Sequence, residues 1–85
     1  MTTTRSEILD HYDIELTKLI SQKYGYDQLS SLRKFLDSQT YKMLSNFKLE
    51  MWDFSPLAIF DMWEVEQISG NPRNSLYLRG DEYGR

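Results

Sequence analysis

The 85-residue chain contains no cysteine, one histidine, two prolines and four glycines. Without cysteine it has neither a disulfide framework nor a thiolate metal site, the two supports on which many very small secreted domains depend. No apolar run approaches the roughly 20 residues that a membrane-spanning helix needs, and residues 1–5 lead into a polar stretch rather than a signal peptide. Asn46, Asn71 and Asn74 all lack Ser or Thr two places on, so no glycosylation sequon is present. These absences predict a cytoplasmic protein with no membrane association.

The sequence also has few residues of the kinds that catalytic and metal sites use. His11 is the only histidine, and on a helix Glu7 and Glu15 lie one turn away on either side of it. Zinc normally takes more nitrogen or sulfur ligands than this chain has, and a Ser-His-Asp triad would have to use this one histidine. Phosphate-binding glycine loops are absent. We therefore expect no enzyme, no cofactor and no metal, with His11 on a solvated helix face.

The composition that remains is that of a folded domain. Hydrophobic residues make up 40% of the chain and charged residues 27%, which is enough apolar surface to offset the entropy of ordering. A chain of this length holds one core. We predict a mainly α (α+β) fold of three to four helices packed on one core, with residues 1–85 as a single domain and residues 1–4 and 80–85 mobile.

The first helix is predicted over residues 5–24. Residues 4–7 read as a capping box, and Gly25 stands where a helix C-terminus favours a left-handed residue. Apolar residues recur at helical spacing between these ends and form one stripe: Ile8, Leu9, Tyr12, Leu16, Leu19, Ile20 and Tyr24. Ile14 falls on the opposite, solvated side, where an aliphatic residue is out of place.

A second helix is predicted to start after Asp27 as its N-cap, with Leu29, Leu32 and Leu36 as its apolar stripe. The apolar phase continues far enough to permit one helix from residue 28 to 46. Asp37 and Ser38 are good capping residues, however, and favour a break with a new short helix from residue 39.

Residues 47–54 alternate apolar and polar side chains with aromatic enrichment, a pattern that predicts a short strand. Ser55 and Pro56 then start a further helix, which Gly70 ends. Its apolar arc is broad enough to contact several neighbours, so we expect it to be the centre of the core: Ala58, Ile59, Phe60, Met62, Trp63 and Val65. Residues 71–72 mark a turn, and residues 75–78 read as a strand that can pair with 47–54 in a two-stranded ribbon.

Charge is distributed unevenly along the chain. Residues 49–72 carry five acidic residues and no Lys or Arg, although the whole chain has a net charge of only −3. Aromatic residues crowd the same window, and aromatic side chains among charges are typical of protein interfaces. On the strand, Trp52 and Phe54 face away from Leu49 and Met51. On the helix, two aliphatics frame two acids in one stripe at i, i+4, i+7 and i+11. The predicted partner-binding set is Trp52, Asp53, Phe54, Leu57, Asp61, Glu64 and Ile68.

These features favour a non-enzymatic protein-binding module, a small regulatory or inhibitory protein that acts through an acidic aromatic surface. Its partner is then another protein with a basic surface, or a second copy of itself. The alternative is a small nucleic-acid-associated regulator that uses the basic residues Arg33, Lys34, Lys42 and Lys48. The acidic balance of the chain and the absence of a recognition-helix motif disfavour it.

Overall fold

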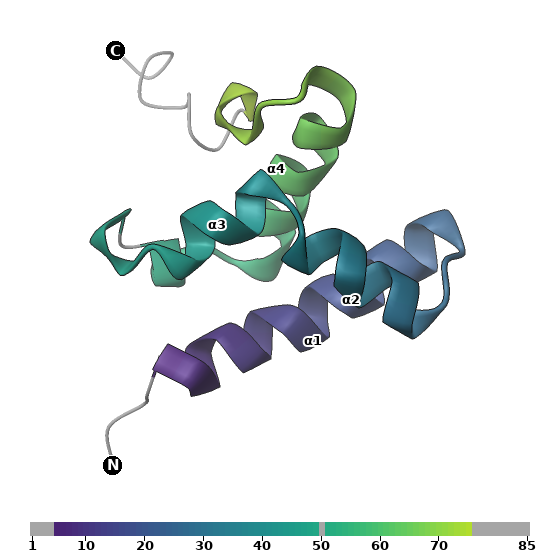
Figure 1. Ribbon diagram of the computed structural model, residues 1–85, viewed down its shortest axis with the longest axis horizontal. Coiled ribbons are helices and arrows are strands. Elements are labelled where there is room, and N and C mark those ends of the chain that lie inside the picture. The colour runs from purple at the N-terminus through teal and green to yellow at the C-terminus, as the bar shows by residue number, and fades with distance from the viewer. Residues whose placement is uncertain (1–4, 50, 76–85) are drawn as a thin grey trace.

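The computed structural model describes residues 5–49 and 51–75, and within these ranges the chain forms four α-helices, three single turns of 3-10 helix and no strand. The mainly helical fold with four helices on one core is thereby confirmed. The helices are α1 (Arg5–Tyr24), α2 (Gln28–Leu36), α3 (Gln39–Ser45) and α4 (Pro56–Ser69), and the 3-10 turns are η1 (Phe47–Leu49), η2 (Met51–Asp53) and η3 (Pro72–Asn74) (Figure 1). The termini that we expect to be mobile lie outside the described residues.

The local capping chemistry explains where the helices begin and end. Gly25 closes α1 with a φ of 74°, and its N–H donates to the Ser21 carbonyl at 2.9 Å. Asp27 caps α2 by accepting from the Ser30 N–H at 2.7 Å. Ser38 caps α3 by accepting from the Tyr41 N–H at 3.0 Å, so the predicted break before residue 39 is confirmed. The predicted capping box of α1 depends on Thr4, which lies outside the described residues.

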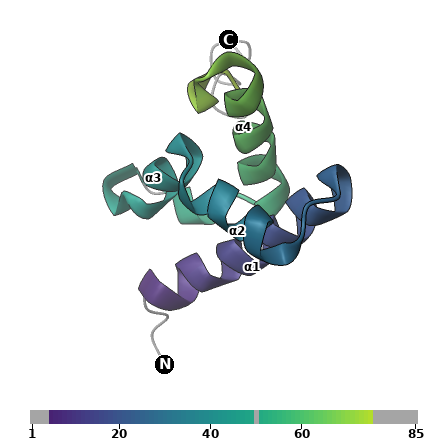
Figure 2. The same ribbon diagram turned by 45° about the vertical axis from the view of Figure 1, so that its right-hand side comes forward.

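The four helices share one core. The two views show α2 folding back along the second half of α1, with α3 continuing beyond it and α4 rising across them (Figures 1 and 2). Each helix contributes buried side chains to a single cluster: Tyr12, Leu16 and Ile20 from α1, Phe35 from α2, Leu44 from α3, and Ile59, Met62 and Trp63 from α4. Among the described residues no helix is both long and apolar enough to cross a membrane.

The prediction that the last helix is the centre of the core is confirmed. Five of its six apolar-arc residues are at most 8% exposed, and Val65 is half-buried. Ser55 caps the helix by accepting from the Ala58 N–H at 3.2 Å, and Pro56 takes the first helical position, where no N–H is needed. Gly70 ends it in the left-handed conformation.

The predicted strand over residues 47–54 is wrong. This segment forms η1 and η2, in which the Leu49 N–H donates to the Asn46 carbonyl at 2.9 Å and the Phe54 N–H to the Met51 carbonyl at 3.0 Å. These local bonds satisfy backbone groups that a strand would have to pair with a neighbour. The Tyr12 hydroxyl donates to the Phe54 carbonyl and anchors the segment to α1. Residues 76–78 of the other proposed strand lie outside the described residues, so the ribbon has no support.

Helix α2 does not bury its whole apolar stripe of Leu29, Leu32 and Leu36. The side chains that face the core are Ser31 and Phe35, both 0% exposed, whereas Leu29 is 58% exposed and Leu36 is 37% exposed. Ser31 fits this close position because it is small and its hydroxyl donates to the Asp27 carbonyl at 2.8 Å. As a result, two of the three residues of the apolar stripe of α2 are exposed.

Candidate functional site

The predicted binding stripe on α4 combines two exposed aliphatics with two half-buried acids. Leu57 is 61% exposed and Ile68 is 89% exposed, at opposite ends of the helix. Asp61 and Glu64 lie between them in sequence and are only half-buried, because each contacts another part of the chain. These contacts decide how much negative charge this face can offer a partner.

Asp61 holds the segment that follows α4. Its carboxylate accepts a 2.6 Å hydrogen bond from the Ser75 hydroxyl, and Ser75 itself is fully buried. The bond ties the end of η3 back onto the middle of α4. One carboxylate oxygen of Asp61 is therefore already engaged in a hydrogen bond within the fold.

Glu64 joins α4 to the end of α1. It forms an ion pair with the Lys23 ammonium at 2.5 Å and accepts a hydrogen bond from the Tyr24 hydroxyl. Burial acts to raise the pKa of Glu64, but the bonds from Lys23 and Tyr24 outweigh it and lower the pKa below its ordinary value. The same hydrogen bond raises the pKa of Tyr24 to about 12, with smaller contributions from burial and from the charge of Glu64.

Glu66 is a structural residue that the sequence did not reveal. One carboxylate oxygen accepts from the Gln39 N–H at 2.8 Å, and the other accepts from the Thr40 N–H at 2.9 Å and the Thr40 hydroxyl at 2.8 Å. The carboxylate thus caps the N-terminus of α3 from another helix. The first turn of α3 carries no acid of its own, which indicates that an acid from elsewhere could cap it. The sequence does not show that this acid is at position 66.

The remaining members of the predicted set lie around η2. Asp53 is exposed, whereas Phe54 is half-buried and packs against the core. Only the backbone of Trp52 belongs to the described part of the chain. The structure therefore brings Leu57, Asp61, Glu64 and Ile68 onto one helix, but two of its acids serve other elements, as does Glu66.

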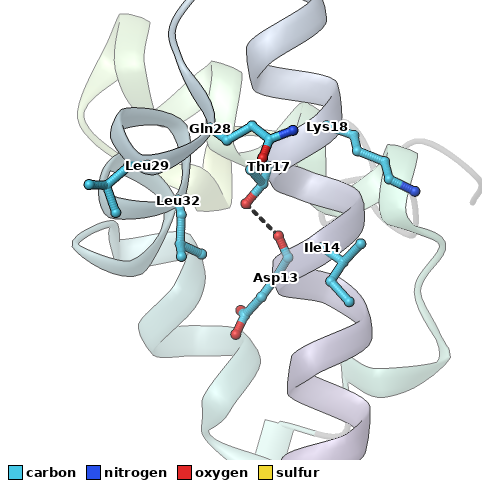
Figure 3. A pocket seen from close by; sticks show the side chains of 7 residues that line it. All are labelled: Asp13, Ile14, Thr17, Lys18, Gln28, Leu29 and Leu32. Atoms are coloured by element: carbon cyan, nitrogen blue, oxygen red, sulfur yellow. Dashed lines mark hydrogen bonds between the residues drawn. The ribbon is translucent and has the colours of Figure 1, made fainter.

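A groove lies between α1 and α2. Its volume is about 590 Å³, and it opens to solvent along its length (Figure 3). Asp13, Ile14, Thr17 and Lys18 line it from α1, and Gln28, Leu29 and Leu32 line it from α2. None of these residues belongs to the set predicted from the sequence, although Ile14 was out of place in the sequence pattern.

The groove is walled by aliphatic side chains. Ile14 is 56% exposed on α1 and Leu29 is 58% exposed on α2, and Leu32 lies half-buried between the two helices (Figure 3). Exposed aliphatics are common on soluble proteins, and here two of them, Ile14 and Leu29, line the same hollow from different helices. Leu29 and Leu32 of the α2 stripe thus contribute to one wall of the groove.

One end of the groove carries a carboxylate in an unfavourable position. Asp13 Oδ1 has no solvent contact and no hydrogen-bond partner among the described residues. The nearby Thr17 hydroxyl donates to the backbone carbonyl of Asp13 at 2.6 Å instead of to its side chain (Figure 3). Burial, together with the negative charge of Asp10, raises the pKa of Asp13. A cation near this half-buried carboxylate would favour its charged form.

The four basic residues of the nucleic-acid alternative are spread over three elements. Arg33 and Lys34 lie on α2, Lys42 on α3 and Lys48 on η1, and all four are exposed. Lys34 lies over the Tyr26 ring, with its ammonium 4.7 Å from the ring centroid. Nothing in this arrangement selects a phosphate backbone, and the alternative stays a prediction.

His11 is exposed, and within residues 5–49 and 51–75 no three His, Asp or Glu side chains converge as metal ligands would. Comparisons with protein-family models, with curated proteins and with solved structures found no match for this chain. The candidate site therefore rests on its own geometry.

Proposed function

We propose that this protein is a non-enzymatic protein-binding module, a small regulatory or inhibitory protein whose docking surface is the α1–α2 groove. The observation that carries the proposal is the pair of half-exposed aliphatics, Ile14 and Leu29, that face solvent across an open hollow. Burying them against a partner removes apolar surface from water, which is the main favourable term in protein association. The cytoplasm is the location that we propose for this binding.

The shape of the groove favours a protein over a small molecule. Its volume of about 590 Å³ falls within the range of ligand pockets, but such pockets enclose most of their ligand's surface. An open groove between two helices instead leaves one side of its occupant uncovered, which suits a helix or another extended piece of protein. The carboxylate of Asp13 at the groove end favours a partner with a basic group.

The acidic face of α4 is the weaker candidate. Asp61, Glu64 and Glu66 each accept hydrogen bonds from another segment of the same chain, so a partner would compete with Ser75, Lys23 and Thr40 for these carboxylates. The three acids lie close together in sequence because α4 bonds a different segment of the chain through each of them. Leu57 and Ile68 remain exposed there and provide a matched control for the groove.

The test compares two double variants. Ile14→Ser with Leu29→Ser removes the aliphatic walls of the groove, and Leu57→Ser with Ile68→Ser removes the exposed aliphatics of α4. All four side chains are more than half exposed, so both variants should fold. Each is immobilised beside the wild-type protein and exposed to one lysate of the source cells, and the bound proteins are identified by mass spectrometry.

The expected result is a protein that is retained by the wild type and the α4 variant and lost by the groove variant. Loss by the α4 variant alone would assign binding to the acidic aromatic face. Equal retention by all three proteins would show that neither set of aliphatics binds a partner and would overturn the proposal.

A further inference from the structure

We propose that the occupant of the α1–α2 groove is a second copy of this chain, paired antiparallel through α1. This inference rests on the proposed function, because it names the partner of the same groove. It starts from the order of the four α1 residues that line the groove, which are Asp13, Ile14, Thr17 and Lys18. This wall presents an acid, an aliphatic, a hydroxyl and a cation in sequence.

The order is self-complementary. A two-fold axis between positions 15 and 16 relates residue 13 to residue 18 and residue 14 to residue 17. In an antiparallel pair Asp13 of each copy therefore lies opposite Lys18 of the other, and Ile14 lies opposite Thr17. Interfaces of this isologous kind are the commonest in soluble oligomers, since one patch serves both subunits. None of these four positions meets a like charge.

The pairing supplies what the isolated chain lacks. Asp13 is half-buried on the groove wall and forms no ion pair among the described residues, and the Lys18 ammonium of the second copy brings an opposite charge to this carboxylate from outside. Lys18 is available for this role, because within its own chain it makes only an exposed contact with Glu15 at 3.5 Å. The second α1 also covers Ile14 and Leu29, which are both more than half exposed in the single chain.

Another protein with a basic helix could fill the same groove, but the pairing of an acid with a cation on one wall favours the second copy. Lys18 on the groove lining would repel a basic partner, which makes a purely basic partner less favourable. The two-fold pairing uses Asp13 and Lys18 equally.

Charge reversal and mixing test the pairing directly. The molar mass in solution is measured by light scattering or sedimentation over a range of concentrations. The wild type is expected to approach twice the chain mass of 10.2 kDa as concentration rises. Lys18→Glu and Asp13→Lys are each expected to raise the dissociation constant at least about tenfold, because they bring like charges together. An equimolar mixture of the two variants restores both attractive pairs and should dimerise again.

Lys42→Glu is the matched control, since it reverses an exposed cation on α3, outside the groove. It should leave the dissociation constant unchanged. If Asp13→Lys does not fold, the exposed variants Ile14→Ser and Lys18→Glu still decide the question, because either alone should weaken the dimer. Circular dichroism establishes that each variant is folded.

Three results would overturn the pairing: a wild-type protein that stays at 10.2 kDa at every concentration, a dimer that Lys18→Glu and Ile14→Ser leave intact, or a mixture of folded variants that stays monomeric. The proposed function has its own readout. A monomer that retains another protein through Ile14 and Leu29, or a dimer indifferent to both residues, contradicts the self-pairing alone. The groove as a docking surface is contradicted when the Ile14→Ser, Leu29→Ser variant loses neither a partner nor a dimer.

Discussion

Replacing Glu66 by Ala should destabilise the protein far more than a half-exposed surface position ordinarily does. The substitution removes the acceptor of three hydrogen bonds from the first turn of α3. It also leaves the Thr40 hydroxyl, in a residue that is 0% exposed, without its carboxylate partner. If the acids of α4 stabilise the fold, Glu66 should show the effect most clearly, because its carboxylate accepts three hydrogen bonds from another helix.

The magnitude follows from the two parts of the loss. A helix N-cap is worth about 0.5–2 kcal/mol, and a buried polar group left unsatisfied costs about 1–3 kcal/mol. The exposed Gln39 N–H can turn to water, which lowers the sum, so we expect about 2–4 kcal/mol. A domain of this size is stable by only about 0.05–0.15 kcal/mol per residue. The melting temperature should fall by roughly 4–8 °C for each kcal/mol lost.

Urea unfolding followed by circular dichroism measures the free energy of unfolding, and a thermal melt gives an independent value. Gln67→Ala is the control, because it truncates an exposed neighbour on the same helix. Glu66→Gln should fall between the two, since it keeps one acceptor oxygen and loses the charge that favours a helix N-terminus. If Glu66→Ala and Gln67→Ala unfold within about 0.5 kcal/mol of each other, the size of an ordinary surface effect, the capping role is refuted.

Two further predictions concern the ends of α1 and α4. The Tyr24 phenol, with its pKa raised to about 12 by the hydrogen bond to Glu64, stabilises the fold fully below its ordinary pKa of 10.0 and loses that contribution as pH rises through 12. An NMR titration of the Tyr24 ring should show this pKa fall toward 10.0 in Glu64→Gln, and an unchanged titration would remove Glu64 as the cause. Gly70→Ala should lower the free energy of unfolding by about 1–2 kcal/mol, the cost of a left-handed backbone for a residue with a Cβ. Because no atom lies within 4 Å of that Cβ, a much larger loss in urea unfolding would contradict the purely backbone origin.

Most of the helical architecture could be read from local chemistry. Asp27, Ser38 and Ser55 each accept a backbone N–H within the turn that follows them, so their effect on helix starts needs no distant partner. Gly25 and Gly70 adopt the positive φ that ends a helix for the same local reason. These signals therefore remain legible in the sequence.

The segment over residues 47–54 shows where this approach fails. Alternating side chains are necessary for a half-buried strand, but a strand also needs a neighbour to pair its backbone. The chain instead closes two 3-10 turns, and Met51 reaches the core at 3% exposure from one of them. Alternation alone does not reveal whether a pairing partner exists.

The candidate site was located only in part for a related reason. Periodicity marks α2 as amphipathic, yet the rotation of that helix about its axis depends on the close fit of Ser31 and Phe35 against the core. That rotation leaves Leu29 exposed, and Leu29 lines the groove together with Ile14. Ile14 was visible in the sequence as an aliphatic on a wet face, but its companion on α2 was not.

The caps that start α2, α3 and α4, the glycines that end α1 and α4 and the concentration of acids after residue 48 are legible in the sequence, because propensity, capping and charge are properties of neighbouring residues. The tertiary structure alone decided what those acids do. Glu66 reaches the first turn of α3 across 26 residues of sequence, and Glu64 reaches Tyr24 across 40. Packing also decided which aliphatics stay exposed, and it left Ile14 and Leu29 on the lining of the groove between α1 and α2.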